Sequence, residues 1–127
     1  MNSRTVFTPH APRPVGPYAQ AVWAGDTLYL SGQIALDPAT GTLVGSTAAQ
    51  QTEQIFKNIE AILHTANLTF AHVVKMTVLL TDIKDFSAVN EVYAKHFSGD
   101  FPARAAYQVG ALPKGALVEI EAVAYRG

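Results

Sequence analysis

His72–Leu80 is the segment that most constrains the fold, because it reads as a β-strand with no polar face. Its apolar residues fall on both sides of the strand, at Val73, Val74, Met76, Val78, Leu79 and Leu80. Successive side chains of a strand point to opposite faces, so both faces of this strand are predicted to be covered. A chain of 127 residues can supply one helical layer but no third layer. We therefore expect helices on one face of the sheet and another subunit on the other.

Two amphipathic helices are predicted, one on either side of this strand in the sequence. The first is expected to begin at a Ser46 cap and to run to about Ala66, where Asn67 can close it. Its apolar stripe consists of Ile55, Ile59, Ile62 and Ala66, widened by Phe56 and Leu63. The second is expected to begin at an Asp85 cap, and its stripe consists of Phe86, Val89, Tyr93 and Phe97.

Strands are expected in further places, each alternating or apolar in sequence: 4–8, 19–24, 27–31, and the two arms of a closing hairpin, 101–110 and 116–125. Gly25-Asp26 is the predicted turn of the middle pair, and Pro113-Lys114-Gly115 that of the closing pair. Residues 10–17 form a proline-rich loop and residues 32–45 a second loop. The order of strands, helix, strand, helix and strands predicts one α+β two-layer domain over residues 1–127, with a mixed β-sheet and two helices on one face.

Composition limits the classes of function. The formal net charge of −1, with no run of Lys and Arg, provides no electrostatic footprint for nucleic acid. The absence of cysteine excludes disulfides, thiolate catalysis and Cys-ligated metals. No apolar stretch approaches the roughly 20 residues that span a bilayer, and no signal core is evident, so a cytoplasmic protein without membrane contact is expected. Charged residues make up only 15% of the chain, against an average of about 25%, which favours a surface partly covered by other subunits.

Several motifs of known chemistry are missing. Gly110 and Gly115 have the glycine spacing of a P-loop, but Ala116 follows where lysine is required. No Gly-x-Gly-x-x-Gly occurs, and Ser31 lacks the preceding glycine of a nucleophile elbow. No zinc-ligand spacing is found among the histidines, which are His10, His64, His72 and His96. We therefore predict neither a metal site nor a nucleotide cofactor.

Arg104 and Glu119 are charged residues within otherwise apolar strand sequences. Such residues are rarely buried unless they are paired or used. The planar fork of arginine matches a carboxylate, and a glutamate in an apolar setting can be tuned as an acid or base. The pair predicts a pocket that holds an anion and activates water, although a structural ion pair is an equal alternative. A closing hairpin would separate the two residues by about 15 Å, so they could share a site if they face each other across a subunit interface.

Other residues have both a functional and a structural interpretation. Tyr18 can direct a phenol into a pocket from the proline-rich loop, or can plug the edge of the core. Ser31 and Gly32 can form a simple turn, or Gly32 can let a ligand approach the backbone closely. Asn90 can be a surface amide or part of a cleft. Glu121 shares a sheet face with Glu119, so one of the two can be an interface charge while the other works.

The combined pattern resembles the signature of the RidA/YjgF family over nearly the whole chain. The matching stretches are Gly16-Pro17-Tyr18, Ser31-Gly32-Gln33, Asp82, Val89-Asn90, Pro102-Ala103-Arg104-Ala105, Tyr107, Gly110, Leu112 and Val118-Glu119-Ile120-Glu121. Many members of the family have cysteine two residues after the arginine, where this chain has Ala106. A main-chain group at this position can still bind a ligand, but a thiol cannot act there.

The resemblance implies a chorismate-mutase-like fold, a homotrimer with a central barrel formed by its sheets, and clefts between subunits. It implies hydrolysis of 2-imino acids, such as 2-iminobutanoate and 2-iminopropanoate, or of their enamine tautomers, to 2-keto acids and ammonia, without a metal or cofactor. Arg104 would bind the substrate carboxylate and Glu119 the attacking water. The residues that would line or support the cleft are Tyr18, Ser31, Gly32, Asn90 and Ala106. The alternatives are a non-catalytic binder or sensor of keto acids, a related enamine-acid deaminase of a catabolic pathway, and the less favoured ribonuclease activity.

Overall fold

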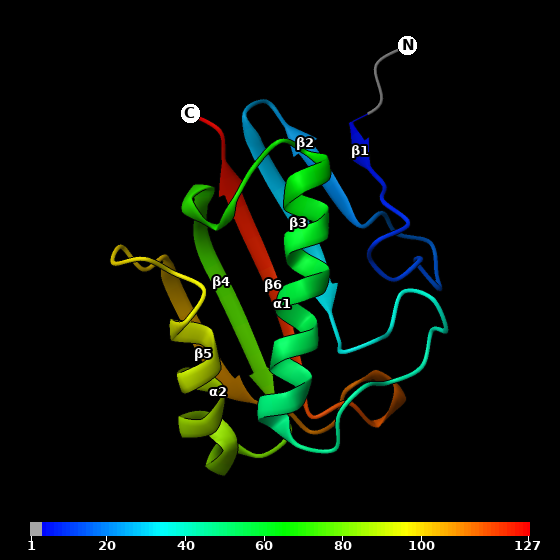
Figure 1. The fold of residues 1–127 in the computed structure, drawn as a ribbon, viewed down its shortest axis with the longest axis vertical. Helices are drawn as coiled ribbons and strands as arrows, with labels where there is room; N and C mark the ends of the chain where they lie inside the picture. The colour runs from blue at the N-terminus through cyan, green and yellow to red at the C-terminus, as the bar shows by residue number, and fades with distance from the viewer. Residues whose placement is uncertain (1–3) are drawn as a thin grey trace.

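The structure is a computed structural model that describes residues 4–127, and its elements follow the predicted order of strands, helix, strand, helix and strands (Figure 1). The strands are β1 (Thr5–Val6), β2 (Ala21–Ala24), β3 (Thr27–Gln33), β4 (Val73–Leu80), β5 (Ala103–Gln108) and β6 (Val118–Tyr125). The helices are α1 (Ala48–Thr65) and α2 (Phe86–Ala94), with 3₁₀ turns η1 (Phe70–His72), η2 (Ile83–Asp85) and η3 (Pro113–Gly115). The predicted strands were therefore placed correctly, within a few residues at their ends.

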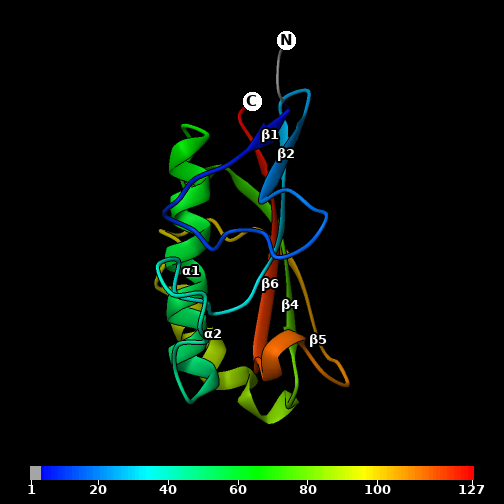
Figure 2. The same ribbon diagram turned by 90° about the vertical axis from the view of Figure 1, so that its right-hand side faces the viewer.

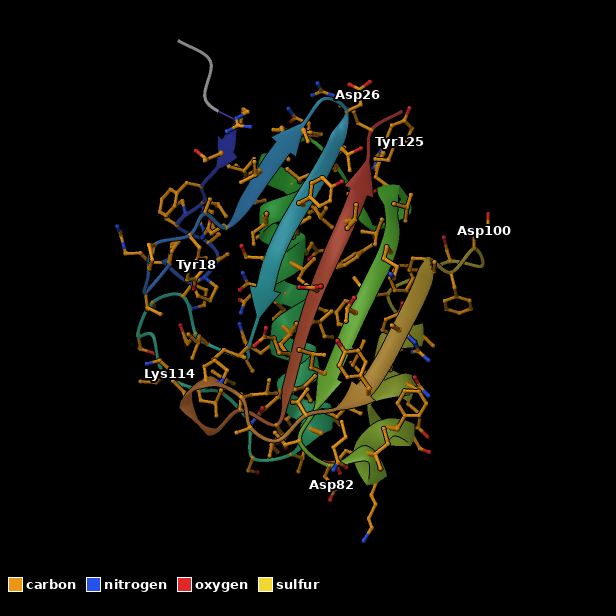
Figure 3. The ribbon with its side chains drawn as sticks, turned by 180° about the vertical axis from the view of Figure 1, so that it is seen from behind. Tyr18, Asp26, Asp82, Asp100, Lys114 and Tyr125 are labelled. Carbon is orange, nitrogen blue, oxygen red and sulfur yellow. The ribbon has the colours of Figure 1, made fainter. Side chains whose placement is uncertain are left out.

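The strands form one mixed sheet in the order β1-β2-β3-β6-β4-β5, so the predicted closing hairpin is wrong. β4 lies between β5 and β6, parallel to the first and antiparallel to the second. The chain leaves β5 at the sheet edge, passes the end of β4 and enters the centre of the sheet as β6 (Figure 3). The Pro113-Lys114-Gly115 turn exists, but it is a 3₁₀ turn in this crossing, with Lys114 at φ 58°. A sequence such as Pro-Lys-Gly predicts that the chain turns, but it does not determine which strands pair on either side of the turn.

Both helices pack on the same face of the sheet, as Figure 2 shows edge-on. The apolar stripe of α1 is buried at Ile55, Phe56, Ile59, Ile62 and Leu63. It packs against the inward side chains of the central strands, which include Leu28, Met76, Val78, Ile120 and Ala122. The prediction of two helices on one face is confirmed.

Within residues 4–127, no helix covers the opposite face of the sheet. In β4, the residues Met76, Val78 and Leu80 are buried, whereas Thr77 and Leu79 between them are only partly covered. A register shift between Val73 and Lys75 leaves Val74 exposed. The sequence predicted that both faces of β4 are covered. Within residues 4–127, the helices cover one face, and the other face is only partly covered. The uncovered side is called the open face below.

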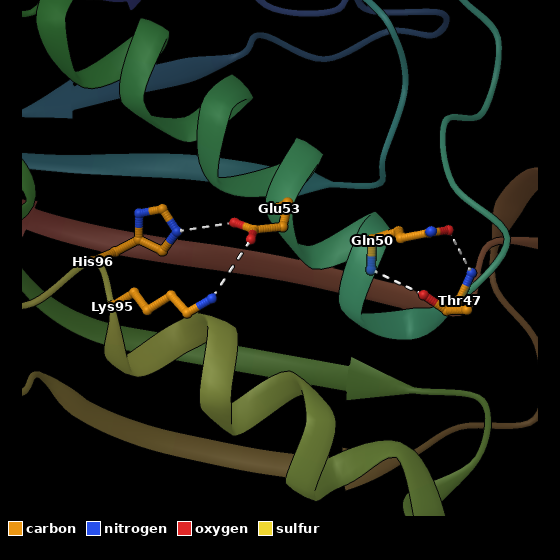
Figure 4. A network of polar contacts seen from close by, with 5 residues as sticks. All are labelled: Thr47, Gln50, Glu53, Lys95 and His96. Carbon is orange, nitrogen blue, oxygen red and sulfur yellow. Dashed lines mark hydrogen bonds and ion pairs between the residues drawn. The ribbon is translucent and has the colours of Figure 1, made fainter.

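The helix caps differ in detail from those predicted. Thr47, and not Ser46, caps α1: its side chain accepts from the amide of Gln50, whose side chain bonds back to the cap (Figure 4). Asp85 stands at the cap position of α2 but forms no side-chain cap bond, whereas Asp82 accepts from Lys84 N at the start of η2. Asn67 adopts φ 61° just beyond α1, as its predicted closing role requires.

Polar side chains connect α1 with the segment that follows α2. The carboxylate of Glu53 on α1 lies 4.0 Å from Lys95 Nζ and 3.7 Å from His96 Nε2 (Figure 4). The His96 ring stacks on Phe56, with ring centroids 4.2 Å apart. These contacts lie just beyond the C-terminal end of α2, where the chain meets α1. Within residues 4–127, neither helix is long and apolar enough to cross a membrane.

Candidate functional site

Glu119 lies on the open face, in a hollow at the boundary of β3 and β6. The hollow has a volume of about 390 Å³ and is lined by Tyr18, Ser31, Gly32, Pro113, Glu119 and Glu121. All of these except Pro113 were singled out from the sequence, and β3, β6 and the loop before β2 bring them together here. Pro113 was not foreseen, because the sequence presented it only as a turn residue.

Gly32 makes room for the carboxylate of Glu119. The pairing of β3 with β6 shifts register between Leu30 and Gln33, which places Gly32 in an irregular part of the ladder. A Cβ atom at Gly32 would lie 2.9 Å from Glu119 Cδ and would collide with the carboxylate. Glycine is needed here for close approach and not for a special φ angle.

Burial and a neighbouring charge act in the same direction on Glu119. Partial burial raises the pKa of the Glu119 carboxyl above its usual value, and the like charge of Glu121 raises it further. The two glutamates are two residues apart on β6 and point to the same face. A carboxyl with a raised pKa can both accept and return a proton nearer to neutral pH, as general acid–base catalysis requires.

Tyr18 is held at the hollow by the loop that precedes β2. The buried amide group of Gln20 fastens this loop, accepting from Thr8 N at 2.7 Å and donating to Pro12 O at 2.9 Å. The hydroxyl of Ser31 donates to Ala19 O at 2.6 Å. Ser31 thus supports the loop and still presents an acceptor oxygen at the hollow. Gln20 was missed in the sequence, where it was only one residue of the predicted strand 19–24.

A buried polar residue of α1 sets the beginning of β6. Gln51 Oε1 accepts from Leu117 N at 2.8 Å, and its amide nitrogen donates to Gly45 O at 3.1 Å. Leu117 lies two residues before Glu119. The helix therefore anchors the strand that carries the glutamate.

Arg104 lies on the other face of the sheet, beneath α2. Its Nη1 donates to Asn90 Oδ1 at 2.7 Å. Its guanidinium carbon lies 4.8 Å from the centre of the Tyr93 ring and 5.1 Å from that of Phe86. Within residues 4–127, no carboxylate oxygen lies within 4.0 Å of its nitrogens. The predicted alternative of a structural ion pair between Arg104 and Glu119 is therefore excluded within one chain.

A cavity of about 430 Å³ opens beside the guanidinium. Its lining consists of Asn90, Tyr93, Ala94, Phe101, Pro102 and Arg104. An arginine without a carboxylate partner, at the wall of a partly apolar cavity, is suited to bind an anionic ligand.

The main chain at Ala106 faces the free edge of the sheet. β5 is the last strand, and Val109 N donates to Leu80 O of β4 at 2.8 Å. Alternate residues of a parallel ladder turn their amides to the same side. Since Val109 faces β4, Ala106 and Arg104 turn theirs away from it. Although Ala106 stands where many family members have cysteine, the main-chain amide at this position is retained.

The two halves of the predicted site are apart in one chain. Met76 of β4 pairs with Arg104 and Ala122, whereas Leu79 pairs with Tyr107 and Glu119. β5 and β6 are separated by two strand spacings, and Arg104 and Glu119 lie opposite residues of β4 that are three positions apart. The Cα atoms of Arg104 and Glu119 are therefore about 14 Å apart. Met76 faces the helices and Leu79 the open face, so the two charged side chains point to opposite faces of the sheet. Figure 3 shows the open face, with Tyr18 and Asp100 marking its two edges.

Two aromatic residues of the Arg104 half were missed as site residues. Phe86 and Tyr93 were assigned only to the apolar stripe of α2, although the i, i+4, i+7 spacing of Phe86, Asn90 and Tyr93 places all three on one helix face. The structure groups no three of the described His, Asp and Glu residues in a way that could hold a metal ion.

The family described as Endoribonuclease L-PSP matches residues 8–126. The chain belongs to this family. It is the family that the sequence motifs indicated under the name RidA/YjgF.

Its relatives match over nearly their whole length. A human protein named 2-iminobutanoate/2-iminopropanoate deaminase is 53% identical over 124 residues, which cover 98% of this chain and 90% of the human one. The crystal structure of RidA from an Antarctic Psychrobacter is 49% identical, with a TM-score of 0.92 and coverage of 95% of this chain and 98% of its own. Escherichia coli TdcF, crystallised with bound serine, is 38% identical, with a TM-score of 0.90. The match covers 97% of this chain and 98% of TdcF. These likenesses bear out the two-layer α+β fold.

Proposed function

We propose that this protein hydrolyses 2-imino acids, including 2-iminobutanoate and 2-iminopropanoate, and their enamine tautomers, to 2-keto acids and ammonia. The observation that carries the proposal is the unpaired Arg104 guanidinium at an open cavity, combined with a partly buried Glu119 of raised pKa. The high identity to the human deaminase supports the same reaction. The serine bound by TdcF is a small amino acid of matching size and carries the same carboxylate group.

Arg104 binds the substrate carboxylate through its fork, and the outward amide of Ala106 adds a main-chain donor. This pair fixes the imine carbon in front of the water. An enamine first takes a proton on carbon to become the imine. Tyr18 and Ser31 border the substrate on the side of Glu119.

Glu119 accepts a proton from water as the water oxygen bonds to the imine carbon, and the C=N bond becomes single. The proton passes to nitrogen in the resulting carbinolamine. The hydroxyl proton then passes by way of Glu119 to the nitrogen, so that the C–N bond breaks, ammonia leaves and the C–O bond becomes the double bond of the keto group. Since Glu119 both accepts and returns a proton, a pKa raised toward neutrality suits both steps.

The complete site requires two subunits, and we infer a homotrimer. Arg104 of one subunit would meet Glu119 of its neighbour, because the two side chains of one chain point to opposite faces. The open face supports this assembly. It carries three tyrosines, Tyr29, Tyr107 and Tyr125, whose side chains are 53%, 51% and 50% exposed. Aromatic residues half-exposed on an uncovered sheet are typical of a surface that a partner covers.

A binder or sensor of keto acids would use the same arginine, and a related enamine-acid deaminase would use the same two half-sites. The term endoribonuclease in the family description raises a further possibility. A net charge of −1 provides little attraction for the phosphates of RNA, so this activity is less favoured.

The test is a hydrolysis assay in which a serine or threonine dehydratase generates the imine in the presence of this protein. A faster decay of the imine, with matching keto acid and ammonia, is expected. Decay at the rate in buffer, combined with tight binding of 2-oxobutanoate, would instead establish a sensor. Cleavage of RNA by the same preparation, lost with Glu119→Gln, would establish the ribonuclease.

A further inference from the structure

We propose that Phe86 and Tyr93 are positioning residues that form an aromatic cage around Arg104 and hold its guanidinium ready for the substrate carboxylate. The cage deepens the proposed function and rests on it, since the ligand that it serves is the anionic end of the imino acid. Neither residue touches the reacting atoms.

The cage has three walls, all from one face of α2. The guanidinium carbon lies 5.1 Å from the ring centre of Phe86 and 4.8 Å from that of Tyr93. Asn90, between them in the sequence, accepts one hydrogen bond from Nη1 at 2.7 Å. The spacing i, i+4, i+7 repeats every helical turn, so α2 presents the three side chains as one stripe toward β5.

The groups that contact Arg104 are two aromatic rings and a neutral amide, so its positive charge is not neutralised and can attract an anionic ligand. An aromatic face attracts a cation without using its N–H donors and without neutralising it. A neutral amide at Asn90 uses one of the five N–H donors of the guanidinium. Within residues 4–127, the Nε and Nη2 donors have no hydrogen-bond partner, so one edge of the fork is free for a bidentate carboxylate. A carboxylate in place of either ring would compete with the substrate for the same charge.

Tyr93 also connects the cage to the core. Its side chain is only 4% exposed. Its ring meets Phe56 edge-on at 5.7 Å and lies 5.1 Å from Phe97. The phenol oxygen is buried and has no hydrogen-bond partner within residues 4–127, so packing of the ring, and not its hydroxyl, positions Tyr93. Burial raises the pKa of this phenol, which keeps it neutral beside Arg104 even though the cation pulls the pKa down. The guanidinium thereby rests against a rigid part of the molecule.

A long, flexible arginine loses much rotamer freedom when it binds a ligand, and a side chain held in advance loses less. The cage is therefore expected to act on substrate affinity. It should have little effect on the proton transfers at Glu119, which lies on the opposite face of the sheet.

The experiment compares leucine substitutions at rings inside and outside the cage, in the full-length assembled protein. Phe86→Leu removes a partly buried ring that contacts Arg104, and Phe70→Leu removes a partly buried ring that contacts Phe56 and Phe97 but not Arg104. Tyr93→Leu tests the second wall, and Tyr93→Phe is its conservative counterpart because the hydroxyl has no partner. The readouts are the Kd of 2-oxobutanoate by calorimetry, the Arg104 Nε–Hε resonance by NMR, and the split between KM and kcat.

Phe86→Leu is expected to raise the Kd roughly 3- to 30-fold, as the loss of a cation–π contact would. It should raise KM by a similar factor, change kcat little and move the Arg104 Hε resonance, which ring currents shift. Phe70→Leu should leave Kd and the resonance as in the unsubstituted protein. Tyr93→Phe should recover most of the affinity that Tyr93→Leu loses.

An unchanged Kd and an unchanged Arg104 resonance in folded Phe86→Leu would overturn the cage, whatever Tyr93→Leu does to folding. Equal effects of Phe70→Leu and Phe86→Leu would also overturn it, by assigning the effect to general packing. The proposed function fails separately. If the protein binds keto acids but does not hydrolyse imines, the cage is still supported by weaker binding in Phe86→Leu.

Discussion

At the scale of the residue, the environment of Glu119 is set by Gly32, by Glu121 and by partial burial. The backbone of Gly32 allows the carboxylate to pack closely, partial burial disfavours its charge, and the charge of Glu121 disfavours it further. None of these influences depends on a metal or a hydrogen-bonded base. The same carboxylate in an exposed strand would titrate as an ordinary surface acid.

Glu119→Gln should lower kcat by about 10²- to 10⁴-fold, because the base is lost while the shape is kept. The Kd of 2-oxobutanoate should change by less than about tenfold, since the substitution leaves Arg104, the proposed carboxylate-binding residue, unchanged. Steady-state kinetics and calorimetry measure the two effects. Glu121→Gln is the control and should reduce kcat far less; equal losses in both variants would point to a structural charge cluster.

The dependence of activity on pH provides a further test of Glu119. If Glu119 must be ionised to accept a proton, activity falls as the pH drops through its raised pKa. Glu121→Gln removes the like charge, lowers the pKa of Glu119 and should move this acidic limb to lower pH. A limb that moved upward would contradict the assignment.

Arg104→Ala should abolish activity and weaken keto-acid binding while the fold survives. Truncating one partner of a desolvated charged contact costs about 2–5 kcal/mol, which is roughly 30- to several-thousand-fold in affinity. Arg104→Lys should recover little, because a point charge lacks the fork and stacks poorly in the cage. Calorimetry with 2-oxobutanoate checks both variants, and wild-type hydrolysis by Arg104→Ala would disprove the clamp.

At the scale of the element, strands and helices determine which residues meet. α1 buries an apolar stripe but also carries Gln51, which holds the beginning of β6 through Leu117 N. The irregular pairing of β3 with β6 brings Gly32 against Glu119. The position of the Glu119 carboxylate therefore depends on how β3 pairs with β6.

Gly32→Ala tests this join. The added Cβ would collide with the Glu119 carboxylate, the flexible end of a side chain, so Glu119 should move while the protein remains folded. We expect a loss of kcat comparable with that of Glu119→Gln, about 10²-fold or more, with little change in Tm. Gly110→Ala is the matched control, because no atom lies within 4 Å of a Cβ there. Full activity in Gly32→Ala would show that the close approach does not matter.

At the scale of the whole molecule, the position of β4 between β5 and β6 separates the two half-sites. Arg104 faces α2 at one edge, and Glu119 faces the open side. Repeating one chain around a three-fold axis would join unlike surfaces of neighbouring subunits, which is the arrangement that brings two different half-sites together.

Light scattering is expected to give three times the mass of the chain at micromolar concentration. Co-expression of Arg104→Ala with Glu119→Gln should then restore activity that neither variant has alone. With random mixing, about a quarter of the sites would combine an intact arginine with an intact glutamate from the neighbour.

Arg104→Ala co-expressed with the double variant Arg104→Ala/Glu119→Gln is the control, because it contains no intact arginine. A stable monomer, or no recovery in the mixed assembly, would contradict the site between subunits.

The sequence by itself determined the order of the elements and the apolar face of each helix, and it singled out Arg104 and Glu119, the charged residue of each half-site. Periodicity carries this information because burial of Ile55, Ile59 and Ile62, for example, follows from their spacing on one helix. The long pattern around Arg104 and Glu119 was specific enough to indicate the family. The contact of Phe86 and Tyr93 with Arg104 could not be predicted from the sequence, because aromatic residues on one helix face are equally expected in a hydrophobic core.

Only the tertiary structure decided which strands pair and therefore which way the charged residues face. Two strands that are consecutive in the sequence favour a hairpin locally, yet β6 gains more by pairing with both β3 and β4 in the centre of the sheet. Such pairing is a non-local contact that no short segment encodes. It places Arg104 under α2 and Glu119 on the open face, and this separation makes a second subunit part of the proposed site.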